Sequence, residues 1–158
     1  MAERALSAFV WAGFALAYSL LLRFVLAGGE AVIFGTPEVV LWFVLPPLCA
    51  GALGALLAPA MAESYRDSMA ATAAGMGCLI PGVSYLMVAV LYALWAVVAG
   101  GTENVFGSLV VIPLYAILFL FTVPLLTLLM FVFGFVASYL HGWLVRLIGR
   151  RAGEGARG

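Results

Sequence analysis

Arg23 is the residue whose type and position most suggest a function, because it is a charge inside a long apolar segment. A charge within the bilayer is costly and is often functional. In one interpretation, its guanidinium group binds a ligand or a partner subunit. In the other, the side chain snorkels to the lipid headgroups or pairs with Glu30, Glu38 or Glu103. The sequence leaves both interpretations open.

The groups that catalysis or metal binding would need do not occur together in this sequence. No Asp or Glu lies in the middle of an apolar segment, where paired carboxylates could act as acid and base. Nucleophile motifs and glycine-rich phosphate loops are also missing. Cys49, Cys78 and the single histidine, His141, stand far apart, and we expect His141 to be solvated at the membrane surface. We therefore predict a protein that is not an enzyme and has no metal or cofactor.

Four prolines at intermediate depth in the apolar segments are further candidate positions: Pro46, Pro47, Pro81 and Pro113. Proline removes a backbone hydrogen bond and bends a helix. Such breaks surround the substrate site of many transporters, but membrane helices also tolerate ordinary kinks. The polar groups nearest a site of this kind would be Ser84, Tyr85 and Tyr115.

The composition places these residues in a membrane. Of the 158 residues, 66% are hydrophobic and 9% are charged, whereas soluble domains have about 45–50% apolar and about 25% charged residues. The lipid bilayer is therefore the first partner. The formal net charge is zero, so no basic patch favours binding to nucleic acid.

Four apolar segments are long enough to cross about 30 Å of hydrocarbon as helices. Their continuous apolar character excludes the alternating pattern of barrel strands. The sequence predicts a single domain that is an all-α bundle of four transmembrane helices. The predicted spans cover about residues 5–27, 39–61, 69–98 and 105–136.

The last apolar stretch, which continues to about Val145, is too long for one span. A break at Thr122-Val123-Pro124 would give five spans. A helix that ends near Val136, followed by an interfacial helix over about 138–151, would give four. We favour four, because the arginines that follow then stay in the cytoplasm with both termini. In the interfacial helix, one face would carry Leu140, Leu144, Leu147 and Ile148, with His141, Arg146 and Arg150 elsewhere on its surface. The all-arginine basic composition suggests a prokaryotic cell membrane.

Small residues predict where two helices approach most closely. Gly51 and Gly54 in the second span, and Gly75 and Gly77 in the third, lie at matching distances from the turn at residues 64–66. Small side chains allow helix backbones to pack closely in lipid. We expect these glycines to form the contact between the second and third spans.

The two halves of the chain carry a weak repeat at an offset of 66 residues. Residues 35–48 and 101–114 share Gly-Thr at their start and Pro-Leu at their end, with six identities in fourteen positions. Internal duplication is common in membrane folds. The match has two possible explanations, a duplicated two-helix hairpin or a coincidence of composition.

Together these patterns favour an accessory or structural subunit of a membrane complex, or a homo-oligomer, that acts through helix contacts. The alternative is a small transporter or channel for a neutral or apolar solute. A second alternative is an enzyme that acts on lipids, with Arg23 or Arg66 holding a headgroup. Beyond the bilayer, the expected partners are other membrane subunits or copies of the same chain.

Overall fold

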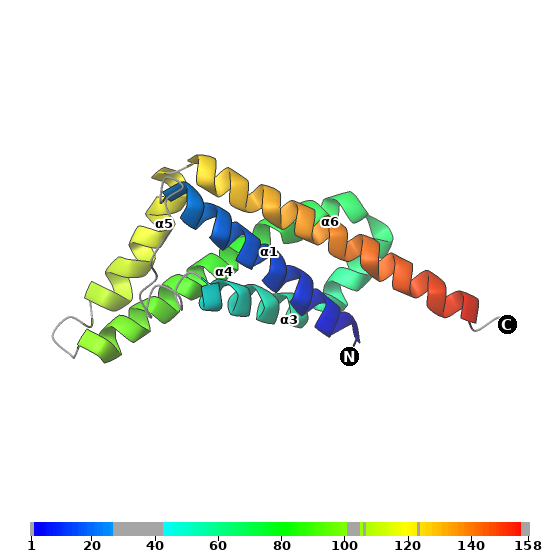
Figure 1. Cartoon of the computed structure of the whole chain (residues 1–158), viewed down its shortest axis with the longest axis horizontal. Coiled ribbons are helices and arrows are strands. Elements are labelled where there is room, and N and C mark those ends of the chain that lie inside the picture. The colour runs from blue at the N-terminus through cyan, green and yellow to red at the C-terminus, as the bar shows by residue number, and fades with distance from the viewer. Residues whose placement is uncertain (1, 27–42, 101–104, 106, 123, 156–158) are drawn as a thin grey trace.

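The computed structural model describes residues 2–26, 43–100, 105, 107–122 and 124–155, and each of them except Ser68 is helical. Figure 1 shows the helices packed side by side along much of their length. The elements are α1 (Ala2–Leu26), α3 (Leu45–Asp67), α4 (Met69–Gly100), the π-helical turn η3 (Gly107–Val111), α5 (Ile112–Thr122) and α6 (Pro124–Gly155).

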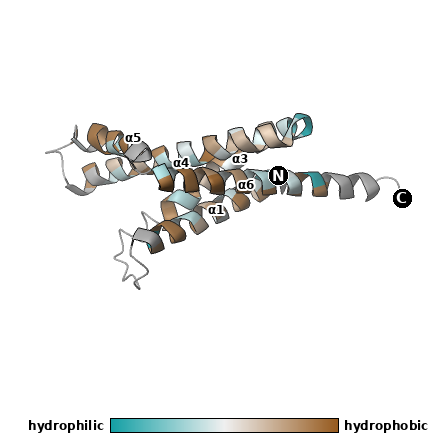
Figure 2. Ribbon diagram, turned by 90° about the horizontal axis from the view of Figure 1, so that it is seen from above, coloured by the Kyte–Doolittle hydropathy of each residue, from teal (hydrophilic) through white to brown (hydrophobic). Residues whose placement is uncertain are grey.

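Four of these helices are long and apolar enough to cross a membrane, which confirms the prediction of a four-helix membrane bundle. The apolar spans are Glu3–Phe24, Leu45–Asp67, Met69–Trp95 and Pro124–Ile148. Helices α1 and α4 run in one direction and α3 and α6 return (Figure 1). Both termini and the turn between α3 and α4 therefore lie at one end of the bundle, here called the terminal end. Figure 2 shows hydrophilic residues there, at this turn and on α6 just before the part of that helix drawn in grey.

The predicted bounds of the last span, 105–136, and of the interfacial helix, 138–151, are wrong. The fourth spanning helix begins at Pro124 and continues without a break to Gly155. Before it, η3 and α5 follow one another without a gap over residues 107–122. This stretch holds only a shorter apolar helix, Leu109–Leu118, and is not among the four helices long enough to cross a membrane. Proline explains the start of α6, because it lacks an amide hydrogen and suits the first turn of a helix. One helix thus ends at Thr122 and the next begins at Pro124, but the helix that ends there is not long enough to make a fifth span.

The buried face of α6 also differs from the prediction, although Leu144 packs on the core and Arg146 is exposed as expected. His141 is completely buried, whereas Leu140 and Ile148 are exposed. The prediction assumed that water would cover one side of this segment. Because α6 is a spanning helix, lipid meets its outer face and apolar residues are stable there. Small residues on its inner face allow close approach, with Gly134 against α4 and Gly142 against Tyr65 of α3.

Glycines mediate close contacts, but not between the helices that the sequence suggested. Gly51 and Gly54 of α3 pack on Ala8 and Trp11 of α1, and a Cβ at Gly51 would come within 3.2 Å of the Ala8 carbonyl oxygen. Gly77 packs on α6, while Gly75 faces open space. Helices α3 and α4 do contact each other, but the predicted strip of facing glycines is wrong. Counting residues back from a turn fixes depth along a helix and leaves its rotation undetermined.

The prolines are placed differently from the predicted set of mid-helix kinks. Pro46 and Pro47 lie in the first turn of α3, and Pro113 is the second residue of α5. At the start of α3 proline costs little, because the first amide groups of a helix have no partner within it. Pro113 instead follows directly on the π-helical turn η3. Only Pro81, in α4, lies inside its helix as predicted. Pro59, inside α3, was not singled out from the sequence.

The two segments of the weak sequence repeat share an unusual backbone feature. Phe43 and Val44, directly before α3, are π-helical, and so are the equivalent residues Leu109 and Val110 in η3. In both places, a proline follows within the first turn of the next helix. A proline cannot donate the α-helical hydrogen bond to the preceding turn, so the shared prolines account for both π-helical turns. Duplication of the hairpin stays a prediction.

Candidate functional site

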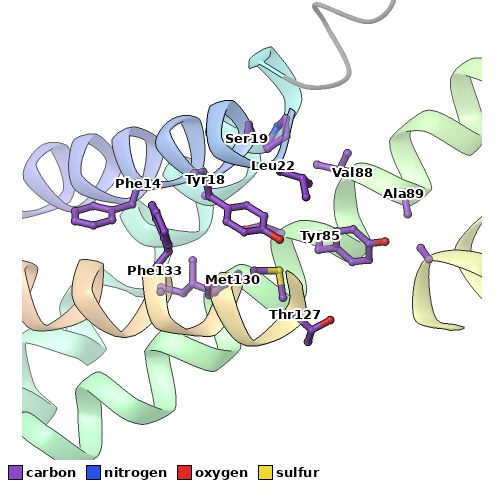
Figure 3. Close-up of a pocket in the computed structure, with 18 of the residues that line it drawn as sticks. Phe14, Tyr18, Ser19, Leu22, Tyr85, Val88, Ala89, Thr127, Met130 and Phe133 are labelled. Carbon is purple, nitrogen blue, oxygen red and sulfur yellow. The ribbon is translucent and has the colours of Figure 1, made fainter. Parts of the chain in front are cut away.

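A cavity of about 390 Å³ lies between the helices, towards the end of the bundle away from the termini (Figure 3). All five α-helices contribute to its wall. The lining extends over residues 11–22 of α1, 80–92 of α4 and 127–134 of α6, and α3 and α5 add residues near their starts. Every side chain in this lining is uncharged.

Aromatic rings form one wall of the cavity. Phe133 of α6 packs edge-on against two rings of α1, with centroid distances of 6.5 Å to Phe14 and 5.8 Å to Tyr18. Figure 3 shows these three rings together beside Met130. Edge-to-face rings and a flexible thioether suit contact with a ring or a hydrocarbon chain. This wall can thus bind an apolar molecule through ring and thioether contacts, and it contains no charged side chain.

Hydroxyl groups from three helices add a small polar component. Tyr18 Oη donates a hydrogen bond to the carbonyl oxygen of Leu126 at 3.0 Å, and Figure 3 shows this hydroxyl pointing towards Tyr85. Thr127 supplies a third hydroxyl to the lining. Ser84 is 5% exposed, and its Oγ has no hydrogen-bond partner. A buried hydroxyl without a partner is costly, so Ser84 is a ready partner for a polar atom of a ligand.

A tightly packed layer closes the bundle between the cavity and the terminal end. Met61, Ala137 and His141 in this layer are completely buried. Tyr65 Oη lies 2.8 Å from the carbonyl oxygen of Ser138, to which it donates, and 2.7 Å from Ser138 Oγ. The ring of His141 lies 5.7 Å from that of Tyr65, and both of its nitrogen atoms are buried without a partner. The cavity therefore does not continue as an open path through this half of the bundle.

The structure brings part of the predicted site together. Pro46 and Pro81 line the cavity. The lining also includes Ser84, Tyr85 and Tyr115, the polar groups expected nearest a site among the prolines. Pro47 and Pro113 are absent from the lining, although Ile112 beside Pro113 belongs to it.

Arg23 does not line this cavity, although the adjacent Leu22 does. It is half-buried in the last turn of α1, where a positive charge interacts favourably with the helix dipole. Its predicted partners Glu30, Glu38 and Glu103 lie outside the described residues. Arg23 therefore remains a candidate for a role outside the cavity.

Sequence reasoning missed the aromatic wall. Phe14 and Tyr18 are four residues apart on α1, and Thr127 and Gly134 are seven apart on α6, so each pair shares one helix face. This spacing was visible, but every face of these segments is apolar. Nothing in the sequence distinguishes an inward aromatic ring from one that faces lipid.

Among the described residues, no three His, Cys, Asp or Glu side chains come close enough to hold a metal ion. No family model, curated protein or solved structure matches this chain. The cavity and the closed layer below it are therefore the observations on which a functional proposal can rest.

Proposed function

We propose that this protein binds a neutral, largely apolar molecule inside the membrane and acts as a small carrier or transporter. The observation that supports this proposal is the uncharged cavity between the helices. Its volume of about 390 Å³ lies within the range of about 300–1,000 Å³ that ligand sites usually have. An ionised molecule would be poorly stabilised there, because no charged side chain compensates for its loss of water.

The lining also limits the chemistry of the ligand. Phe14, Tyr18 and Phe133 offer ring edges and faces to a flat or hydrocarbon group. Ser84 Oγ, buried and without a partner, calls for one hydrogen-bonding atom such as a carbonyl or hydroxyl oxygen. We expect a mainly hydrocarbon molecule with at least one such oxygen.

The closed layer favours a carrier over a permanently open channel. The residues around Tyr65, Ser138 and His141 fill the interior between the cavity and the terminal end. A solute that enters the cavity therefore needs a change in helix packing to leave on the other side. Pro81, which lacks one helical hydrogen bond, lies at the boundary between cavity and layer and is a natural point of bending.

Trp11 provides a test of binding, because it lines the cavity and is 2% exposed. A variant with Trp42, Trp95 and Trp143 changed to Phe retains Trp11 as the single tryptophan. Titrating it in nanodiscs with 1-bromonaphthalene, a neutral aromatic probe that quenches fluorescence, is expected to give saturable quenching. Ala89→Phe, which fills the cavity, is expected to weaken this binding about tenfold because overpacking is unfavourable.

Ala74→Phe is the matched control, because Ala74 is an exposed residue of the same helix and lies outside the cavity lining. It is expected to leave the quenching curve unchanged. Quenching that rises linearly with probe concentration, and equally in all three proteins, would mean that the probe only dissolves in the lipid. That result would contradict a binding site.

For orientation, we propose that the terminal end faces the cytoplasm of a prokaryotic cell. Support comes from Arg4, Arg66 and Arg146, which all lie towards this end, since positive residues favour the cytoplasmic side. Reporter enzymes fused to the C-terminus and to the turn at Ser68 test this orientation. Activity of a periplasmic reporter at either position would contradict it.

The roles of accessory subunit, homo-oligomer and lipid-acting enzyme, and the expectation that the protein is not an enzyme, remain predictions. Purification from the native membrane in mild detergent separates the first two from a carrier. A stoichiometric partner together with a cavity that binds no probe would favour a subunit. Saturable probe binding by the isolated chain would favour the carrier.

A further inference from the structure

A second, smaller recess of about 160 Å³ opens at the terminal end, between α1, α3 and α6. Its charged lining consists of Glu3, Arg66 and Arg146. Ala62 and Val145 supply apolar wall, and Tyr65 closes one side. Unlike the uncharged cavity, this recess presents both signs of charge to whatever enters it.

The recess lies at the depth of the lipid headgroups. Glu3 is the first residue of the apolar span of α1, Arg66 is next to last in that of α3, and Arg146 lies two residues before the end of that of α6. Near the same level of α6, Tyr139 and Trp143 are half-exposed on the outer surface. Aromatic residues of this kind mark the interface between hydrocarbon and headgroups.

The charged groups that line the recess form no direct ion pair with one another. Within the described part of the chain, no carboxylate oxygen lies within 4.0 Å of a nitrogen of Arg66 or Arg146. Arg146 Nη2 donates a hydrogen bond to the carbonyl oxygen of Tyr65. A guanidinium group has five N–H donors, so Arg146 retains donors for an anion.

We propose that this recess binds the headgroup of a phospholipid that carries a primary ammonium group. Arg66 and Arg146 hold the phosphate, since guanidinium groups match phosphate oxygens in charge and geometry. The carboxylate of Glu3 accepts hydrogen bonds from the ammonium group. A purely anionic headgroup meets repulsion from Glu3, and a quaternary ammonium group has no N–H to donate to it.

This site is independent of the carrier proposal. The packed layer around Tyr65 and His141 lies between the recess and the uncharged cavity. A headgroup in the recess would join the start of α1, the end of α3 and the last part of α6. The acyl chains of such a lipid would lie in the surrounding bilayer, against the apolar outer surface of the bundle.

Native mass spectrometry of the full chain in detergent tests the assignment with added phosphatidylethanolamine, phosphatidylcholine, phosphatidylglycerol or inorganic phosphate. Phosphatidylethanolamine is expected to bind with the lowest Kd. Arg66→Gln and Arg146→Gln are each expected to raise that Kd about tenfold, the scale of a hydrogen bond to a charged group. Glu3→Gln is expected to raise it about threefold while tightening phosphatidylglycerol binding, as for an exposed ion pair.

Arg4→Gln is the matched control, because Arg4 is exposed beside Glu3 and does not line the recess. It is expected to change none of these affinities. If Arg146→Gln fails to fold because its bond to Tyr65 is lost, Arg66→Gln decides the result. Equal affinity for the three lipids, or no effect of Arg66→Gln and Glu3→Gln, would overturn the proposal. Inorganic phosphate that competes fully at millimolar concentration would assign the recess to a free anion instead.

Discussion

The carbonyl of Gly77 in α4 faces Gly134 in α6 so closely that a Cβ at Gly134 would overlap its oxygen atom. Pro81, four residues after Gly77, has no amide hydrogen to donate to this carbonyl. The oxygen is therefore left without its helical partner and lies against the neighbouring backbone. A Cα–H···O contact at such a crossing gives it partial compensation.

This crossing predicts that Gly77→Ala and Gly134→Ala destabilise the bundle. Each added methyl group would force α4 and α6 apart, at a cost of about 1–3 kcal/mol. Thermal unfolding in detergent measures the effect. Gly75→Ala is the control, since Gly75 lies in the same helix with open space around its Cα. It should be neutral or slightly stabilising, because alanine favours a helix more than glycine does. Equal loss of stability in all three variants would contradict the crossing.

Tyr65→Phe should weaken the packed layer. It removes the hydroxyl that bonds to Ser138, and it leaves the Ser138 carbonyl oxygen with one partner fewer. Hydrogen bonds between membrane helices are worth about 0.6–2 kcal/mol, so we expect a loss of that size in thermal unfolding. Tyr139→Phe, on the exposed side of α6, serves as the control. A stability for Tyr65→Phe equal to that of the control would argue against the bond.

His141→Leu should stabilise the protein. The change removes two buried nitrogen atoms that have no partner and keeps a side chain of similar size. Unsatisfied buried polar atoms cost about 1–3 kcal/mol each, so even a partial gain should raise the unfolding temperature. Loss of stability would mean that His141 finds a polar partner in the membrane-embedded protein.

Pro81→Ala should weaken binding of 1-bromonaphthalene to the cavity. It removes ring atoms that line the cavity and contact Gly134. The expected loss is about fourfold, equivalent to one buried methylene group. Pro113→Ala is the comparison, because Pro113 lies in the first turn of α5 and outside the lining. The same Kd for both variants and the parent protein would show that Pro81 does not shape the site.

The number of spans could be predicted because apolar length alone sets it. The bounds of the last one were missed. Thr122-Val123-Pro124 pointed to a possible break, but nothing in the apolar run showed that the segment before it is a short helix that packs on α4. Helix rotation was equally hidden. In a soluble helix, the polarity of His141 and Leu140 would predict which of them faces the solvent. In a membrane helix the outer face meets lipid, so polarity no longer predicts which face is buried.

The same limit applies to the site. Prolines and hydroxyl residues near Ser84 could be picked out as rare among apolar neighbours, and the structure gathers several of them. The ring cluster of Phe14, Tyr18 and Phe133 depends on which face each helix turns inward. Small residues such as Gly54 and Gly134 determine this rotation, because they allow close contact with Trp11 and Gly77, which lie far from them in the sequence.

The packed layer at the terminal end has an electrical consequence. An ion that reached the bottom of the cavity would meet the tightly packed side chains of Met61, Ala137 and His141, where the loss of its hydration is prohibitive. Liposomes that contain the protein should therefore hold a potassium or proton gradient as long as empty liposomes do. A neutral ligand can therefore enter and leave the cavity while the membrane stays impermeable to ions.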